Sequence, residues 1–316
     1  MKQSAWIQMI IAVIATIFLG LGASAHADFL YVTNFSQPFI PDAISRVAPD
    51  GTVSTFATGF NDPHGMAFDK SGNLLVANAI GSYLSEVSPS GMVTAFAPGV
   101  SANQGVAFDS KGNLYVADGL ANVVREITPK GGVSTFATGF NLPGYIAFDH
   151  QDNLYVANFF GGTVSKVGPS GGVATTFATG FFNPNGLAFD TSGNLYVTNY
   201  MTDGTVSRVG PNGGVATPFA TALHGPLGLA FDPSGNLYVA NWDSGTVSRV
   251  GPNGGVATTF ASGLHYPWGL AFEPAIAVPE PASWLLVLCG SGLSFFVFCS
   301  LKKISQRINH GSRLAS

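Results

Sequence analysis

A pattern of about 40 residues repeats along the middle of the chain, and it limits the possible folds more than any other feature. One copy reads GLAFD at 186–190, GNLYVTN at 193–199, TVSRV at 205–209 and GGVATPFA at 213–220. Each piece is short, rich in β-branched and aromatic residues, and bounded by Gly, Pro, Asn or Asp. This is typical of strands joined by turns. Each copy therefore predicts four β-strands.

Two aromatic positions mark the six copies of this pattern. The tyrosine-type position of the second strand is occupied by Tyr31, Leu75, Tyr115, Tyr155, Tyr196 and Tyr238, at intervals of 40 to 44 residues. The phenylalanine of the first strand is Phe68, Phe108, Phe148, Phe189, Phe231 and Phe272. A period of about 40–45 residues with four strands in each copy indicates propeller blades.

The two ends of the repeat region are complementary. The region starts on a second strand at 29–34, with no first strand before it, and finishes on a lone first strand at 269–272. Pairing the last strand with the first three completes a sixth blade and removes the exposed edges of an open array. A solenoid would not need this truncation. We predict an all-β, six-bladed β-propeller at 28–275, with four antiparallel strands per blade and a ring closed by the N- and C-terminal strands.

Residues 1–27 differ in composition from the repeats. Lys2 precedes an apolar run at 6–21, and Ala25, His26 and Ala27 supply an A-x-A arrangement of small residues. These features predict a secretory signal peptide that is cleaved before Asp28. An uncleaved anchor helix is the alternative.

The C-terminal end contains an apolar run of 18 residues at 284–301, and no charge falls between Glu280 and Lys302. This length is enough to span a bilayer, so we predict a transmembrane helix in preference to a core helix. The basic residues of 302–316 place that tail in the cytoplasm. Both cysteines, Cys289 and Cys299, lie in this run. The exported domain therefore has no disulfide.

Charge excludes one class of partner. Residues 28–280 hold all 17 acids and eight of the 13 bases, which gives this segment a net charge of 8 − 17 = −9. A nucleic-acid-binding domain carries a basic surface, so we expect no nucleic-acid partner. The same excess of acids disfavours tight binding to anionic polymers.

The pattern GLAFD-x-x-GNLYV, as at 186–197, resembles the NHL repeat, and the resemblance covers about 29–273. It implies a propeller, but proteins with NHL-type propellers include scaffolds, ligand binders and enzymes. Ahead of the apolar run, Val278, Pro279, Glu280 and Pro281 at 276–283 resemble a PEP-CTERM sorting signal, with the apolar span and the basic end in the right order.

The sorting-signal resemblance implies a cellular location and a partner enzyme. It implies recognition by an exosortase-type processing enzyme in the envelope of a Gram-negative bacterium that makes exopolysaccharide. The chain is then anchored in the inner membrane through 284–301, with processing to the surface or the extracellular matrix as the alternative. The segment after the span has 15 residues, which is longer than the short basic end usual in that family.

An acid follows the first strand in every copy, at Asp69, Asp109, Asp149, Asp190, Asp232 and Glu273. These segments superficially resemble calcium loops, but they lack the further carboxylates of an EF-hand. In a hairpin turn, Asp accepts hydrogen bonds from backbone N–H groups and Gly adopts positive φ. We predict that these acids are structural.

Strand direction brings the loops that leave the second strands and those that enter the first strands to one face, here called the top face. The second strands end there at Asn34, Asn78, Asp118, Asn158, Asn199 and Asn241, and the first strands open there at His64, Gln104, Gly144, Asn185, Leu227 and Trp268. Amides beside aromatic rings suit sugar hydroxyls and CH faces. The alternative is that each Asn only satisfies loop backbone. The candidate ligand-binding residues are His64, Gln104, Asp118, Asn158, Asn185, Asn199, Asn241, Trp242 and Trp268.

The leading functional prediction is a non-catalytic binding or scaffold module whose top face takes an exopolysaccharide or an envelope protein. No serine is set beside a base and an acid, and His224 and His265 are expected in exposed loops, so we assign no catalytic residue and no cofactor. The alternative is an enzyme similar to streptogramin B lyase or to the SMP-30/gluconolactonase type, which holds a divalent cation such as calcium at its channel. Asp118 is the one acid among the candidates, and no glutamate matches that metal site.

Overall fold

The computed structural model describes residues 29–35, 41–81, 83–97, 99–100, 103–201 and 203–274, which form strands and turns. The predicted signal peptide, sorting motif, transmembrane helix and basic tail lie outside these residues. Among the residues that are described, no helix is long and apolar enough to cross a membrane.

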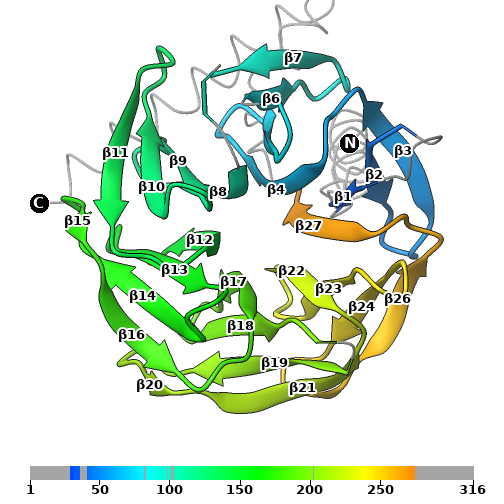
Figure 1. Cartoon of the computed structure of the whole chain (residues 1–316). Coiled ribbons are helices and arrows are strands. Elements are labelled where there is room, and N and C mark those ends of the chain that lie inside the picture. The colour runs from blue at the N-terminus through cyan, green and yellow to red at the C-terminus, as the bar shows by residue number, and fades with distance from the viewer. Residues whose placement is uncertain are drawn as a thin grey trace, which may run out of the picture. The chain divides into compact units, whose positions relative to one another are not determined.

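Six β-sheets surround a central axis in the described part of the chain (Figure 1). The inner strands are β4 (Pro63–Phe68), β8 (Asn103–Phe108), β12 (Pro143–Phe148), β17 (Pro184–Phe189), β22 (Pro226–Phe231) and β27 (Pro267–Phe272). The second strands are β1 (Leu30–Asn34), β5 (Leu74–Asn78), β9 (Leu114–Asp118), β13 (Leu154–Asn158), β18 (Leu195–Asn199) and β23 (Leu237–Asn241). The third strands are β2 (Ala43–Val47), β6 (Leu84–Val87), β10 (Val123–Ile127), β14 (Thr163–Val167), β19 (Gly204–Val209) and β24 (Thr246–Val250). The outer strands are β3 (Val53–Thr58), β7 (Val93–Phe96), β11 (Val133–Thr138), β16 (Thr175–Thr179), β21 (Thr217–Leu223) and β26 (Thr258–Ser262).

Blades 1 to 5 begin with the inner strands β4, β8, β12, β17 and β22, and blade 6 combines β27 with β1, β2 and β3. In blade 6, Leu30 pairs with Phe272 and Val32 with Leu270 in an antiparallel ladder. The side chain of Thr33 adds a bridge between blades, because its Oγ1 accepts from the N–H of Gly269 and donates to the carbonyl of His64, both at 2.7 Å. The predicted six-bladed ring with terminal closure is confirmed.

One predicted strand divides in two. Residues 213–220 were expected to form a single fourth strand, but β20 (Gly214–Val215) pairs in parallel with β16 of the preceding blade, and only β21 joins its own sheet. β15 (Gly172–Val173) and β25 (Gly255–Val256) pair with the preceding blades in the same way. Blades 3 to 5 have one extra residue here: ten positions separate Val167 from Phe177, against nine from Val47 to Phe56. In blade 4, the extra residue and the positive φ of Gly213 and Gly214 let the segment after the turn reach the outer strand of the preceding blade.

The recurring aromatic positions fill the space between blades. The ring of Tyr155 meets Phe177 of its own blade at 4.8 Å and Phe189 of the next blade at 4.9 Å, both edge to face. Tyr31, Tyr115, Tyr196 and Tyr238 have equivalent pairs of phenylalanine neighbours. Such pairs contribute about 0.5–1.5 kcal/mol each beyond the area that they bury. The period of the sequence is thus the period of the blade-to-blade packing.

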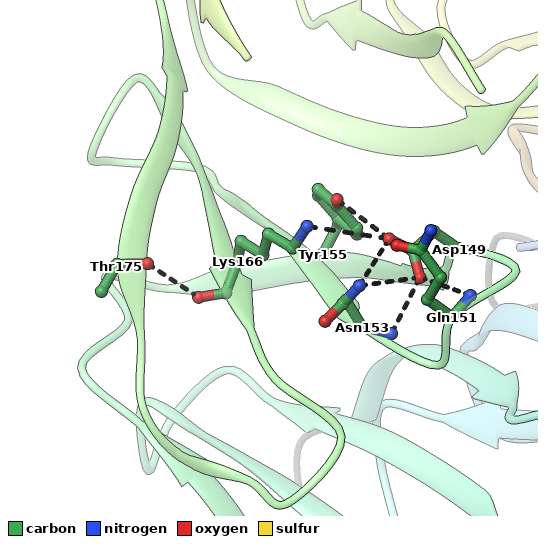
Figure 2. Close-up of polar contacts among 6 residues, drawn as sticks. All are labelled: Asp149, Gln151, Asn153, Tyr155, Lys166 and Thr175. Carbon is green, nitrogen blue, oxygen red and sulfur yellow. Dashed lines mark hydrogen bonds and ion pairs between the residues drawn. The ribbon is translucent and has the colours of Figure 1, made fainter. Parts of the chain in front are cut away.

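In blades 1 to 5 the Asp after the inner strand stabilises a turn, as predicted; Glu273 follows β27, which no hairpin turn connects to its partner strand β1. Figure 2 shows Asp149, whose Oδ1 accepts from the backbone N–H groups of Gln151 and Asn153, both at 2.9 Å. Its Oδ2 accepts from the side-chain amide of Asn153 at 2.8 Å and from the hydroxyl of Tyr155 at 3.1 Å. Asp190 has the same set of contacts with Ser192, Asn194 and Tyr196.

These turns predict a loss of stability in acid. Partial burial favours the neutral acid at Asp149 and Asp190, but the hydrogen bonds to each carboxylate outweigh it and hold the pKa below the ordinary value of 3.8. A lowered pKa in the folded state adds stability that is complete above that ordinary value and is lost as pH falls through the folded pKa. We expect the melting temperature to be steady from about pH 7 to pH 5 and to fall below about pH 4.

Thermal unfolding across this pH range measures the effect. The Asp149→Asn, Asp190→Asn double variant should melt lower at neutral pH and lose less on acidification. An equal acid response in both proteins would contradict the assignment.

Candidate functional site

The second strands end at the top face on amides that are buried and bonded within the protein. Nδ2 of Asn158 donates to Oγ of Ser165 at 2.8 Å, and its Oδ1 accepts from the N–H of Asn141 at 3.1 Å. The other members of this set are Asn34 with Ser45, Asn78 with Ser85, Asn199 with Ser207, and Asn241 with Ser248. The side chains of Asn158, Asn199 and Asn241 are thus occupied in strand-end contacts, as in the structural alternative.

Blade 2 replaces this amide–hydroxyl pair with an ion pair. Oδ2 of Asp118 accepts from Nε of Arg125 at 2.8 Å, and Oδ1 accepts from the N–H of Ala121 at 2.9 Å. The carboxylate is 1% exposed. Arg125 stands where the other five blades have serine. This exchange of serine for arginine in the third strand is the feature of the sequence that could have identified the partner of Asp118.

The mouth of the channel holds a cavity of about 350 Å³, here called the mouth pocket. It is lined by Gln104, Leu142, Pro143, Gly144, Phe159, Asn185, Tyr200, Leu227, Trp242 and Trp268. The structure therefore brings together four of the predicted site residues: Gln104, Asn185, Trp242 and Trp268. Phe159 and Tyr200 join them because each directly follows a strand-end Asn, as Trp242 does.

Aromatic rings form two parts of the pocket wall. Trp242 meets Trp268 at 4.9 Å, nearly perpendicular, and stacks on Phe35 at 5.7 Å. Phe159 and Tyr200 lie 6.1 Å apart. Gln104 and Asn185 add amide groups to the pocket lining. None of the described lining residues carries a formal charge.

His64 contacts two of the residues that line the pocket. Its imidazole is 5% exposed and stacks on Trp268, with ring centres 3.7 Å apart and planes 7° from parallel. Nδ1 lies 3.2 Å from Oε1 of Gln104, and Nε2 lies 3.2 Å from Oδ1 of Asp62. Both nitrogens are therefore engaged, and His64 positions Trp268 and Gln104. His224 and His265 are exposed, as expected.

Four exposed apolar side chains follow the second strands of blades 1 to 4 on the same face. Ile80, Leu120, Phe160 and Met201 are 45–79% exposed, and each lies two positions after a strand-end Asn or Asp. We call these four residues the rim. Exposed apolar residues are typical of an interaction surface where they form one patch.

A calcium site on the top face is part of the predicted enzyme alternative. Calcium takes six to eight oxygen ligands with several carboxylates. The described residues include no group of three or more His, Cys, Asp or Glu that could hold a metal ion. Asp118, the acid of the predicted alternative, is held by Arg125.

Comparison with solved structures shows the same fold in proteins of different function. Virginiamycin B lyase from Staphylococcus aureus matches with a TM-score of 0.57 and 15% identity, over 73% of this chain and 84% of the lyase. The gluconolactonase XC5397 from Xanthomonas campestris gives 0.58 and 16%, over 75% and 85%. A chain of the nidogen/laminin complex gives 0.68 and 18%, over 78% and 98%. Neither a scan against family models nor a search of curated proteins found a match. At these identities, the likeness shows the fold alone.

Proposed function

We propose that this chain is an exported NHL-type propeller whose mouth pocket binds a neutral exopolysaccharide without catalysing a reaction. The observation that carries this proposal is the uncharged pocket with two aromatic walls and two amides. The CH faces of a sugar pack on aromatic rings, and its hydroxyls pair with amides that both donate and accept. The cavity volume is at the lower end of the range of about 300–1,000 Å³ typical of ligand sites.

The sequence supports the location of this activity. The predicted signal peptide at 1–27 would direct export, and the predicted span at 284–301 would then anchor the propeller in a Gram-negative envelope. An exosortase-type enzyme would recognise Val278 to Pro281. The sorting-signal resemblance implies a bacterium that makes exopolysaccharide, so the same cell would supply such a polymer. A neutral polymer also avoids repulsion by the net charge of −9 derived above.

The rim favours a second candidate, docking of an envelope protein. Its exposed apolar residues would be buried in a protein interface, whereas a sugar in the mouth pocket need not touch them. The two candidates therefore depend on different side chains of one face.

The enzyme alternative depends on catalytic groups. The two relatives named as a lyase and a gluconolactonase share only the fold with this chain. On the top face, His64 has both nitrogens engaged and Asp118 is paired with Arg125, so we propose neither a catalytic residue nor a metal cofactor. One divalent ion per chain after purification, lost on Asp118→Ala substitution, would contradict this.

Removing an aromatic wall should abolish most of the binding. We expect Trp242→Ala to weaken binding of a neutral glycan at least tenfold, which corresponds to about 1.4 kcal/mol. The full chain, in a detergent without sugar groups, is screened on a glycan array and the best glycan is measured by calorimetry.

Phe160→Ala is the matched control, because Phe160 is an exposed aromatic residue of the same face that does not line the pocket. Loss of glycan binding in both variants would contradict the pocket. Absence of binding on the whole array, with capture of an envelope protein that Phe160→Ala abolishes, would favour the second candidate.

A further inference from the structure

The channel contains one residue that departs from the repeat. The third residue of the inner strands is glycine in five blades, at Gly65, Gly105, Gly186, Gly228 and Gly269, and is Tyr145 in blade 3. Neighbouring inner strands touch at these glycines: a Cβ on Gly228 would lie 2.4 Å from the carbonyl oxygen of Trp268. The equivalent position of β12 is occupied by Tyr145, which carries a side chain where the other five inner strands have none.

Tyr145 crosses the channel. Its strand, β12, stands opposite β27 in the order of the six blades. Its hydroxyl reaches to 2.9 Å from the position that a Cβ on Gly269 would occupy, and Gly269 belongs to β27. The residue is 8% exposed. Gly144, one position nearer the top face, lines the mouth pocket. The side chain of Tyr145 therefore obstructs the channel close below that pocket.

Two polar atoms of pocket-lining residues are buried without a partner. Oδ1 of Asn185 and Nε1 of Trp268 have no hydrogen-bond partner among the described residues, and Asn185 is only 4% exposed. Buried polar groups are almost always paired, so each unpaired atom points to a ligand or an ordered water. One is an acceptor and the other a donor, and sugar hydroxyls can satisfy both.

We propose that the mouth pocket is blind and receives the terminal residue of a neutral glycan chain, with Asn185 and Trp268 bonding its hydroxyls. This rests on the proposed function. A polymer cannot pass Tyr145, so a chain entering from the top face has to end in the pocket.

The test is a length series of the neutral glycan that gives the strongest array signal, as linear oligomers. If one chain end is recognised, the Kd per mole of chain should change less than about threefold from about three to about ten residues. A Kd that falls in proportion to the number of internal residues would overturn end recognition and leave the proposed function standing. No binding of any neutral glycan would overturn both.

Two variants test the residues. Asn185→Leu should weaken binding about tenfold without lowering the melting temperature, because it removes an unpaired buried acceptor. Unchanged affinity would show that the acceptor is met by water. Tyr145→Phe keeps the aromatic ring that obstructs the channel, so this variant should keep the preference for the ends of glycan chains. Loss of that preference in Tyr145→Phe would contradict the obstruction.

Discussion

Replacing Arg125 with serine should destabilise the propeller by about 3–5 kcal/mol, because it leaves a buried carboxylate without its ion-pair partner. Asp118 is 1% exposed, and its other hydrogen bond, from the N–H of Ala121, does not neutralise it. The opposite change, Asp118→Asn, should cost only about 1 kcal/mol, since Arg125 is 29% exposed and can turn to water.

The chain itself supplies the control for this prediction. The other five blades have an Asn–Ser pair at the same two positions, with Nδ2 to Oγ distances of 2.8–2.9 Å. The Asp118→Asn, Arg125→Ser double variant recreates that pair and should return to within about 1 kcal/mol of the native protein, far from the sum of the single changes. Denaturant unfolding of the native protein, the two single variants and the double variant completes this double-mutant cycle. A double variant as unstable as Arg125→Ser would show that blade 2 cannot accept the pair.

Replacing Gly186 with alanine should destabilise the protein by about 3 kcal/mol, at the upper end of the usual cost of overpacking. The added Cβ would lie 2.2 Å from the carbonyl oxygen of Leu227 on the next inner strand. Both atoms are fixed to backbone, so no side-chain rotation relieves the clash. At roughly 2–4 °C per kcal/mol for a domain of this size, the melting temperature should fall by about 10 °C.

Gly210→Ala is the matched control in the same blade. Gly210 is exposed, and a Cβ there would meet no heavy atom within 4 Å. A surface change of this kind should alter stability by no more than about 0.5 kcal/mol. Because Leu227 also lines the mouth pocket, Gly186→Ala should weaken ligand binding as well. Equal melting temperatures for the two variants would disprove the close contact between β17 and β22.

The fold could be predicted because each blade packs against the next through the same set of side chains. Tyr155 and its equivalents recur where a ring must fill the gap between two sheets, so the period of the sequence reports the period of the structure. The parallel pairing of β20 with β16 was missed, because a run of residues with β propensity does not specify its partner strand.

The site could be predicted only in part. Strand direction predicted that Gln104, Asn185, Trp242 and Trp268 share the top face, and all four line the mouth pocket. Whether a side chain faces the pocket or the backbone depends on its hydrogen-bond partners, and the sequence pattern does not show those. His64 lies behind Trp268 for this reason, and Asn158 is turned toward Ser165.

The inner strand of blade 6, β27, has three roles in this molecule. β27 completes the ring, carries Trp268 to the mouth pocket, and continues through Pro274 into the C-terminal segment. In the ladder between β27 and β1, the pair of Phe272 and Leu30 lies nearer the C-terminal end of β27 than the pair of Leu270 and Val32. Peeling of β27 would pull Trp268 away from His64. Ring closure and the wall of the mouth pocket thus depend on the same ladder between β27 and β1, so a change that opens the ring also disturbs the pocket.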